Sequence, residues 1–169
     1  ISLGSPLGSL RFGVGSKCET IPTSAFENCV NLETITLSEK IKDIKVNAFA
    51  NCSSLKTIEL PNTLLNIDEK AFYNCASLEK IKIPDSVTSV GVSAFEGCSS
   101  AETIAIGSGL TALNNRLFFG SGVKDLVIPE TVVSLGTEVF AESKDMVSVN
   151  TGNTITKIPA NTFSGCSAL

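Results

Sequence analysis

The sequence contains no histidine and no tryptophan, and Tyr73 is its only tyrosine. The absence of histidine excludes Ser-His-Asp and Cys-His catalysis and HExxH zinc sites, because each of them requires an imidazole. The sequence also lacks any uninterrupted apolar run of about 18 residues, the length that a membrane-spanning helix needs. Enzymes built on histidine and proteins inserted in the membrane are therefore excluded as classes.

The charged residues show no excess of basic side chains. Thirteen basic and 17 acidic residues give a formal charge of −4, and the basic ones are scattered from Arg11 to Lys157. Nucleic acid attracts proteins with a basic stripe or patch, so it is not an expected partner. The sequence is 43% hydrophobic over 169 residues, which is enough for one folded domain. Because it begins at Ile1 without a basic leader, we expect it to be a processed or excised piece.

An internal repeat organises almost the whole chain. Phenylalanine recurs every 23 residues, except for one interval of 22 residues between Phe118 and Phe140. The repeat has the form I-x-x-x-A-F-x-x-C-x-x-L-x-x-I-x-L-P-x-x-V and is seen clearly from Ile44 to Leu64. Its seven units are marked by Phe26, Phe49, Phe72, Phe95, Phe118, Phe140 and Phe163.

Each unit predicts a short strand and a turn. The segment x-I-x-L, as in Thr34 to Leu37, alternates with period two and indicates a strand whose Ile and Leu point inward. We interpret the Ala-Phe segment as one turn of α- or 3₁₀-helix on the opposite wall, preceded by a second extended piece such as 87–90. One unit cannot bury its own apolar edge, so the units must stack. We predict a β-rich α/β repeat solenoid of about seven turns with one short parallel strand per turn.

This repeat resembles the leucine-rich repeat of BspA-like bacterial and protozoal surface proteins. The resemblance rests on the Ala-Phe pair and the spaced Cys, as in Ala48, Phe49 and Cys52, and covers about 12–169. It implies a leucine-rich repeat fold, an extracellular or cell-surface location, and modules that mediate adhesion through a concave or flattened strand face. The inward Asn that follows the strand in common leucine-rich repeats is missing. A parallel β-helix is the alternative architecture.

The repeat places the chain in a single domain over 1–169, with an irregular N-terminal segment at 1–9. The last unit stops at Leu169 before its strand, which leaves the strand around Val149 as an open edge. Unpaired backbone groups beside apolar side chains invite another chain. We therefore expect either that the natural protein continues or that the chain self-associates through this edge.

The cysteines form a column rather than pairs. Cys29, Cys52, Cys75 and Cys98 each follow the repeat phenylalanine by three residues, and Cys166 repeats the position. A disulfide framework and metal capture are the functional interpretations. Ser121 and Ser143 fill the same position in two units, and stacked parallel side chains have poor geometry for a bridge. We predict free, buried thiols that serve as small core residues, with Cys18 in the core as well.

The outward strand positions are the candidate binding surface, since the core does not need their side chains. Arg11 and Gly13 are the expected positions in the first strand. Lys80 and Lys82 are the only close cationic pair on this face. The threonines have an alternative explanation, because β-branched residues suit strands in general. The candidate partner-binding residues are Thr34, Thr36, Thr57, Glu59, Lys80, Lys82, Thr103 and Asp125.

A second candidate patch lies on the opposite wall. Phe119 follows the repeat phenylalanine in the unit that deviates most, and Tyr73 occupies the same position two units earlier. Exposed aromatic side chains here would form an apolar patch for a partner. Drift among repeats explains the two residues equally well.

The leading functional hypothesis is a non-enzymatic protein-interaction or adhesion module of a secreted or cell-surface protein. Its ligand would be a protein, such as host extracellular matrix or another cell surface. The alternative is a structural spacer or stalk that displays other domains and has no ligand. An enzyme that uses carboxylates alone, as glycosidases do, is disfavoured because no convergent acidic pair is seen. We expect no cofactor and no metal, since no calcium-loop motif occurs.

Overall fold

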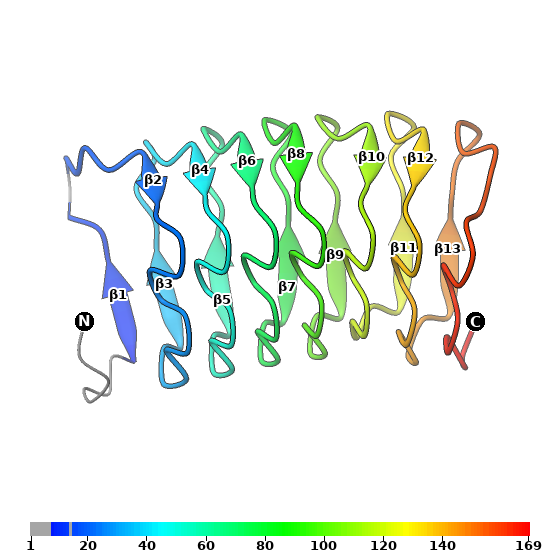
Figure 1. Cartoon of the computed structure of the whole chain (residues 1–169), viewed down its shortest axis with the longest axis horizontal. Helices are drawn as coiled ribbons and strands as arrows, with labels where there is room; N and C mark the ends of the chain where they lie inside the picture. Colours follow the sequence, from blue (N-terminus) through cyan, green and yellow to red (C-terminus); the bar gives the residue numbers. More distant parts are fainter. Residues whose placement is uncertain (1–7, 14) are drawn as a thin grey trace.

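The repeat builds an elongated parallel β-solenoid (Figure 1). The structure is a computed structural model and describes residues 8–13 and 15–169. Strands of three residues form what we call the first wall: β1 (Ser9–Arg11), β3 (Thr34–Thr36), β5 (Thr57–Glu59), β7 (Lys80–Lys82), β9 (Thr103–Ala105), β11 (Asp125–Val127) and β13 (Ser148–Asn150). Strands of two residues form the second wall: β2 (Thr20–Ile21), β4 (Asp43–Ile44), β6 (Asn66–Ile67), β8 (Ser89–Val90), β10 (Ala112–Leu113) and β12 (Ser134–Leu135).

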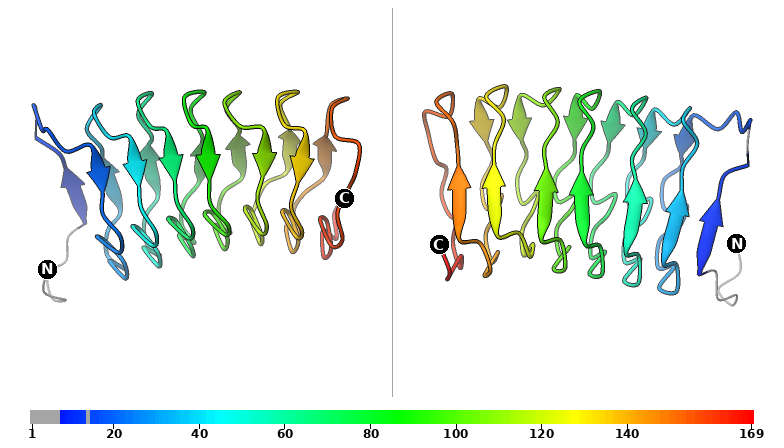
Figure 2. Two further views of the ribbon diagram at one scale, coloured as in Figure 1. Left: turned by 45° about the horizontal axis from the view of Figure 1, so that its top comes forward. Right: turned by 180° about the vertical axis from the view of Figure 1, so that it is seen from behind.

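The two walls run along opposite sides of the array (Figure 2). Every strand pair is parallel, and equivalent residues face each other, as in Ile35 with Ile58 and Ile81 with Ile104. The second wall pairs in the same way, for example Ile44 with Ile67. A constant repeat length produces this register, because each apolar residue then lies above its equivalent in the preceding unit. The predicted parallel strand and the second extended piece are both confirmed in the units from Phe26 to Phe140, whereas the described residues of the Phe163 unit contain neither strand.

The predicted helical turn on the opposite wall is wrong, because the described residues contain no helix. The residues two before and two after each repeat phenylalanine have positive φ, as at Asn47 (55°) and Asn51 (60°) around Phe49. At most three residues lie between these left-handed positions, which is too few for a helical turn with consecutive right-handed residues. We call this helix-free side of the solenoid the turn wall.

Backbone hydrogen bonds on the turn wall alternate between two directions. The Phe49 N–H donates to the Ala71 carbonyl of the next unit at 2.8 Å, whereas the Ala50 N–H donates to Asn47 at 3.0 Å. Every second N–H therefore bonds three residues back, and the others bond along the array. The turn wall holds neighbouring units together much as a strand does.

The repeat phenylalanines stack through the centre of the array. The rings of Phe49, Phe72 and Phe95 are fully buried, and their centroids are 5.2 and 5.0 Å apart with nearly parallel planes. These values confirm the predicted buried stack. Because each ring packs on the ring of the next unit, the stack defines the distance between units.

The cysteine column is a column of free thiols. Cys52 donates its S–H to the Phe26 carbonyl of the preceding unit at 3.1 Å, and Cys75 donates to Phe49 at 3.2 Å. Ser143 donates its hydroxyl to Phe118 in the same way, at 3.4 Å. Serine can replace cysteine at this position because it is small and can donate the same hydrogen bond.

The two ends of the repeat differ from the sequence prediction. In β1, Leu10 pairs with Ile35 and Arg11 pairs with Thr36, so Gly13 is not an outward strand position. Leu10 and Ile35 are 25 positions apart instead of 23, because the first unit has two extra residues. At the other end, Ile158 stands five residues before Phe163, as buried Ile44 does before Phe49, but it is 49% exposed. Of the predicted irregular segment 1–9, residues 1–7 lie outside the described residues, and β1 begins at Ser9.

Candidate functional site

The predicted binding residues all lie on the first wall. Each strand has its central residue turned into the core and its outer two residues in solvent, as in β3, where Thr34 and Thr36 are exposed around buried Ile35. The period of two in the sequence produces this pattern. The structure thus brings the eight candidate residues together on one face: Thr34, Thr36, Thr57, Glu59, Lys80, Lys82, Thr103 and Asp125.

Parallel register fixes which of these side chains are neighbours. Thr34 lies beside Thr57, and Thr36 lies beside Glu59. Further along the array, Lys80 lies beside Thr103. Asp125 accepts a hydrogen bond of 2.5 Å from the Ser148 hydroxyl on β13, which orients its carboxylate. The surface therefore presents ordered polar groups about 4.8 Å apart along the array.

Lys80 and Lys82 differ from most lysines in this protein. Lys42, Lys56 and Lys124 each bind a carboxylate of the preceding unit at 2.9 to 3.1 Å. Among the described residues, no carboxylate oxygen lies within 4.0 Å of the Nζ atom of Lys80 or Lys82. Two ammonium groups on β7 are thus free to meet a ligand.

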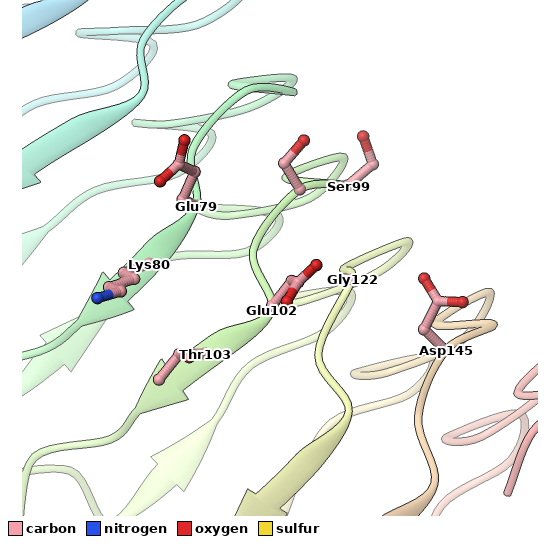
Figure 3. Close-up of a pocket in the computed structure, with 8 residues that line it drawn as sticks. Glu79, Lys80, Ser99, Glu102, Thr103, Gly122 and Asp145 are labelled. Carbon is pink, nitrogen blue, oxygen red and sulfur yellow. The ribbon is translucent and has the colours of Figure 1, made fainter.

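A shallow groove borders the first wall where the chain enters β9 and β11 (Figure 3). The shortened unit creates it, since Gly122 alone replaces two residues, Ser99 and Ser100, of the preceding unit. A Cβ atom on Gly122 would come within 2.4 Å of the Ser99 carbonyl oxygen, so only glycine allows this close approach. The groove is lined by Glu79, Lys80, Ser99, Ser100, Glu102, Thr103, Gly122 and Asp145.

Sequence reasoning missed this groove, although the 22-residue interval between Phe118 and Phe140 signalled it. A deletion in one turn of a stacked array leaves the turns on both sides protruding beyond it. Glu102 bridges to Lys124 at 3.1 Å, but both side chains are more than half exposed, so this pair contributes little stability. The groove extends the first-wall surface with hydroxyl and carboxylate groups.

The second predicted patch is more covered than expected. Phe119 is half-buried, and the Arg116 guanidinium lies 3.8 Å from the centroid of its ring. Tyr73 is also half-buried, with the Lys70 ammonium 5.9 Å from its ring. The two aromatic residues lie on the turn wall with their rings partly covered by cations, a more polar surface than the apolar patch that the sequence indicated.

An asparagine ladder on the turn wall was also missed. Asn51 donates a side-chain N–H to Asn28 at 3.0 Å, and Asn74 donates to Asn51 at 3.3 Å. These three residues stand two after the repeat phenylalanine and have positive φ. The ladder lies at the surface, in contrast to the inward Asn ladder of the commonest leucine-rich repeats. Asn at 23-residue spacing was the available signal.

The repeat also matches a known family. The family model for the BspA type leucine rich repeat region matches residues 19–147 and 111–169, with six copies of the repeat. The chain belongs to this family. The BspA-type repeats confirm the resemblance seen in the sequence. No curated protein matches the chain.

Solved structures of bacterial leucine-rich repeat proteins share the fold. A leucine rich cell surface protein of Faecalibacterium prausnitzii is 31% identical over 78% of this chain and 36% of its own, with a TM-score of 0.71. A leucine-rich repeat protein of Bacteroides ovatus is 27% identical over 95% of this chain and 53% of its own, with a TM-score of 0.65. The T. pallidum leucine rich repeat protein, 23% identical over 98% of this chain and 79% of its own, has a TM-score of 0.71 and shows the fold alone.

These comparisons support the coarse classification of the chain. It spans between about a third and about half of the first two relatives' own lengths. BspA-type repeats and a cell-surface relative suggest a protein-interaction role at an extracellular or surface location. In the part of the chain that the structure describes, no helix has the length and apolar character to cross a membrane.

Proposed function

We propose that this chain is a non-enzymatic protein-interaction module of an extracellular or cell-surface protein, and that the first wall is its binding surface. One observation carries the proposal: Lys80 and Lys82 project from β7 into solvent without a salt bridge among the described residues. Parallel pairing of β7 with β9, and of β3 with β5, holds many of the surrounding polar side chains in register. Such a preorganised surface loses little conformational entropy when it binds.

The chemistry of the face defines the kind of ligand. The predicted contact residues on the first wall include no Trp, Tyr or Phe, the residues that supply much of the binding energy at protein interfaces. Its few charges would tune the association rate and its salt dependence more than the affinity. We therefore expect a weak protein ligand that engages several units at once. Arrays of such units would gain affinity through multivalency.

Binding of the immobilised chain to extracellular-matrix proteins and to intact cells tests the proposal. For a ligand found in this way, Lys80→Glu combined with Lys82→Glu should weaken binding at least about tenfold. The melting temperature should hardly change, because both side chains point away from the core. Lys17→Glu combined with Lys40→Glu makes the same change in charge at exposed sites off the first wall and is the matched control.

Other outcomes would indicate a different binding surface or a different function. Binding that survives the change at Lys80 and Lys82 but is lost with Phe119→Ser, in a variant that still folds, would move the site to the turn wall. No binding to any protein or cell would favour the spacer. Sedimentation of the chain alone tests the remaining expectation, self-association beside β13.

A further inference from the structure

Both walls of the solenoid are interrupted at one boundary between units. β8 does not pair with β10, and β9 does not pair with β11. Among the described residues, strands pair on at least one wall at each of the remaining boundaries from the Phe26 unit to the Phe140 unit. We call the interrupted boundary, between the Phe95 and Phe118 units, the seam. It immediately precedes the one-residue deletion.

The phenylalanine stack changes at the seam as well. The rings of Phe95 and Phe118 are 5.9 Å apart and inclined by 16°, the largest distance and angle in the stack. Before the seam, neighbouring rings are 5.0 to 5.2 Å apart and inclined by 8° or less. Beyond the seam the rings are 5.8 and 5.7 Å apart. Dispersion forces fall quickly with separation, so the core holds neighbouring units less tightly from the seam onward than before it.

Side chains and the turn wall replace the missing strand pairs. On the second wall, the Asn114 side chain donates to the Val90 carbonyl at 2.7 Å, a carbonyl of β8 itself. On the turn wall, the N–H groups of Ser93, Phe95 and Gly97 donate to carbonyls of the next unit at 2.8 to 3.1 Å. The turn wall is thus the part of the seam where backbone hydrogen bonds persist.

Arg116 is the strongest of the side-chain links. It donates two hydrogen bonds to Glu96 across the seam, at 2.7 and 3.0 Å, and a third to Glu138 in the following unit. The Glu96 side chain is only 11% exposed. A bidentate pair between a guanidinium and a largely buried carboxylate is among the stronger polar contacts in proteins. Through this pair Arg116 links the two units between which no strands pair.

We propose that the seam is a built-in opening point, at which the solenoid separates into two blocks, and that Arg116 holds it closed. The N-terminal block comprises β1 to β9 and the C-terminal block comprises β10 to β13. In a stacked array, each unit is stabilised by its neighbours, so the weakest contact between neighbours determines where the array opens. The seam passes between Thr103 and Asp125 on the first wall, so opening would alter the spacing of that face. The inference stands independently of the proposed binding function.

Hydrogen exchange of the unmodified chain tests the seam directly. The Phe95 and Gly97 amides donate across the seam, and the Phe49 and Asn51 amides make the same bonds at the boundary between the Phe49 and Phe72 units, where β4 pairs with β6. Protection factors should be at least about tenfold lower for Phe95 and Gly97 than for Phe49 and Asn51. Equal protection at the two boundaries would overturn the proposal. This comparison needs no variant and no ligand.

Variants test the role of Arg116. Arg116→Gln should lower the protection of Phe95 and Gly97 by a further tenfold or so, with Phe49 and Asn51 nearly unchanged. Lys56→Gln, which removes an exposed ion pair with Glu33 inside the N-terminal block, is the control and should leave the seam unaffected. Combining Arg116→Gln with Glu96→Gln should recover part of the loss, because no buried carboxylate then lacks its partner. Equal loss of protection at both boundaries, or none at either, would refute the role of Arg116.

Discussion

The N-terminal and C-terminal blocks are built from the same repeat, but the contacts between neighbouring units differ from one block to the other. Uniform spacing of 23 residues in the N-terminal block gives a continuous second wall and rings at most 5.2 Å apart. In the C-terminal block, which contains the 22-residue interval, the Phe118 and Phe140 rings are 5.8 Å apart and Ser121 and Ser143 replace the thiols. The wide spacing also occurs at the 23-residue intervals from Phe95 to Phe118 (5.9 Å) and from Phe140 to Phe163 (5.7 Å), so the number of residues in a unit does not by itself set how closely the rings stack.

The largest expected effect comes from removing a ring of the stack. Phe72→Ala and Phe140→Ala both empty a fully buried site, and each should cost on the order of 3 to 5 kcal/mol of unfolding free energy. Phe72 should cost more, because its neighbouring rings pack more closely on both sides. Urea denaturation of the two variants measures both values. An unchanged melt for Phe72→Ala would refute the stack, and a larger cost at Phe140 would contradict the comparison of the blocks.

The next effect concerns the cysteine column, in which Ser121 and Ser143 replace cysteine in the C-terminal block. Ser143 is fully buried and makes hydrogen bonds to Ser121 at 2.9 Å and to the Phe118 carbonyl at 3.4 Å. Ser143→Ala leaves the Ser121 hydroxyl without this partner and should cost about 1 to 2 kcal/mol. Ser143→Cys should cost less, since a thiol can donate to this carbonyl as Cys52 donates to the Phe26 carbonyl of the preceding unit. Equal costs in denaturation experiments would show that side-chain volume alone matters.

A smaller effect concerns the stability of the fold at low pH. Burial raises the pKa of Glu96, but hydrogen bonds from Arg116 and Ser93 outweigh it, so the pKa lies below its ordinary value of 4.5. A lowered pKa stabilises the fold fully above 4.5, and this contribution is lost as the pH falls through the lowered value. Thermal melts of the wild type should show this loss below pH 4.5, and Glu96→Gln should lack that part of the pH dependence. Identical pH profiles would show that Glu96 does not link the blocks electrostatically.

The smallest expected effect concerns the chemical reactivity of the thiols rather than the stability of the fold. Burial raises the pKa of Cys52 and Cys98 to about 12 and places that of Cys75 well above its ordinary value. Thiolates are the reactive form, so these three cysteines should resist alkylation at pH 7.5 in the native chain and react in denaturant. Peptide mass mapping identifies the labelled sites. Native labelling of these three, or an intact mass about two hydrogens lower per cysteine pair, would refute buried free thiols.

Much of the scaffold was predictable from apolar columns alone. The 23-residue period identified the parallel strands, the buried phenylalanines and the family, and period two within Thr34 to Leu37 identified the outward residues. These features follow from local alternation and from the requirement that each unit bury its edge against the next. The predicted position of the first strand was wrong by two residues, because a fixed period cannot reveal the two extra residues after Leu10.

The candidate surface was predictable in part. Which side chains share the first wall follows from the alternation, but which lysines stay unpaired does not. Lys56 forms a salt bridge with Glu33 of the preceding unit, while Lys80 forms none among the described residues. The groove and the bonds from Arg116 to Glu96 likewise depend on how far apart the stacked units lie. Such contacts join residues 20 or more positions apart, and no local pattern encodes them.

The sequence by itself determined the repeat, the strands and the core of this protein, whereas the tertiary structure decided the turn wall. Lys70, Arg116 and Glu138 all adopt positive φ, although such residues rarely do so. Nothing in their side chains signals that conformation. Their position in a stacked unit requires it, because the left-handed turn directs the N–H groups of Lys70 and Arg116 to a carbonyl of the next unit. A single unit taken alone would lack that acceptor, so only the assembled array selects these turns over the expected helix.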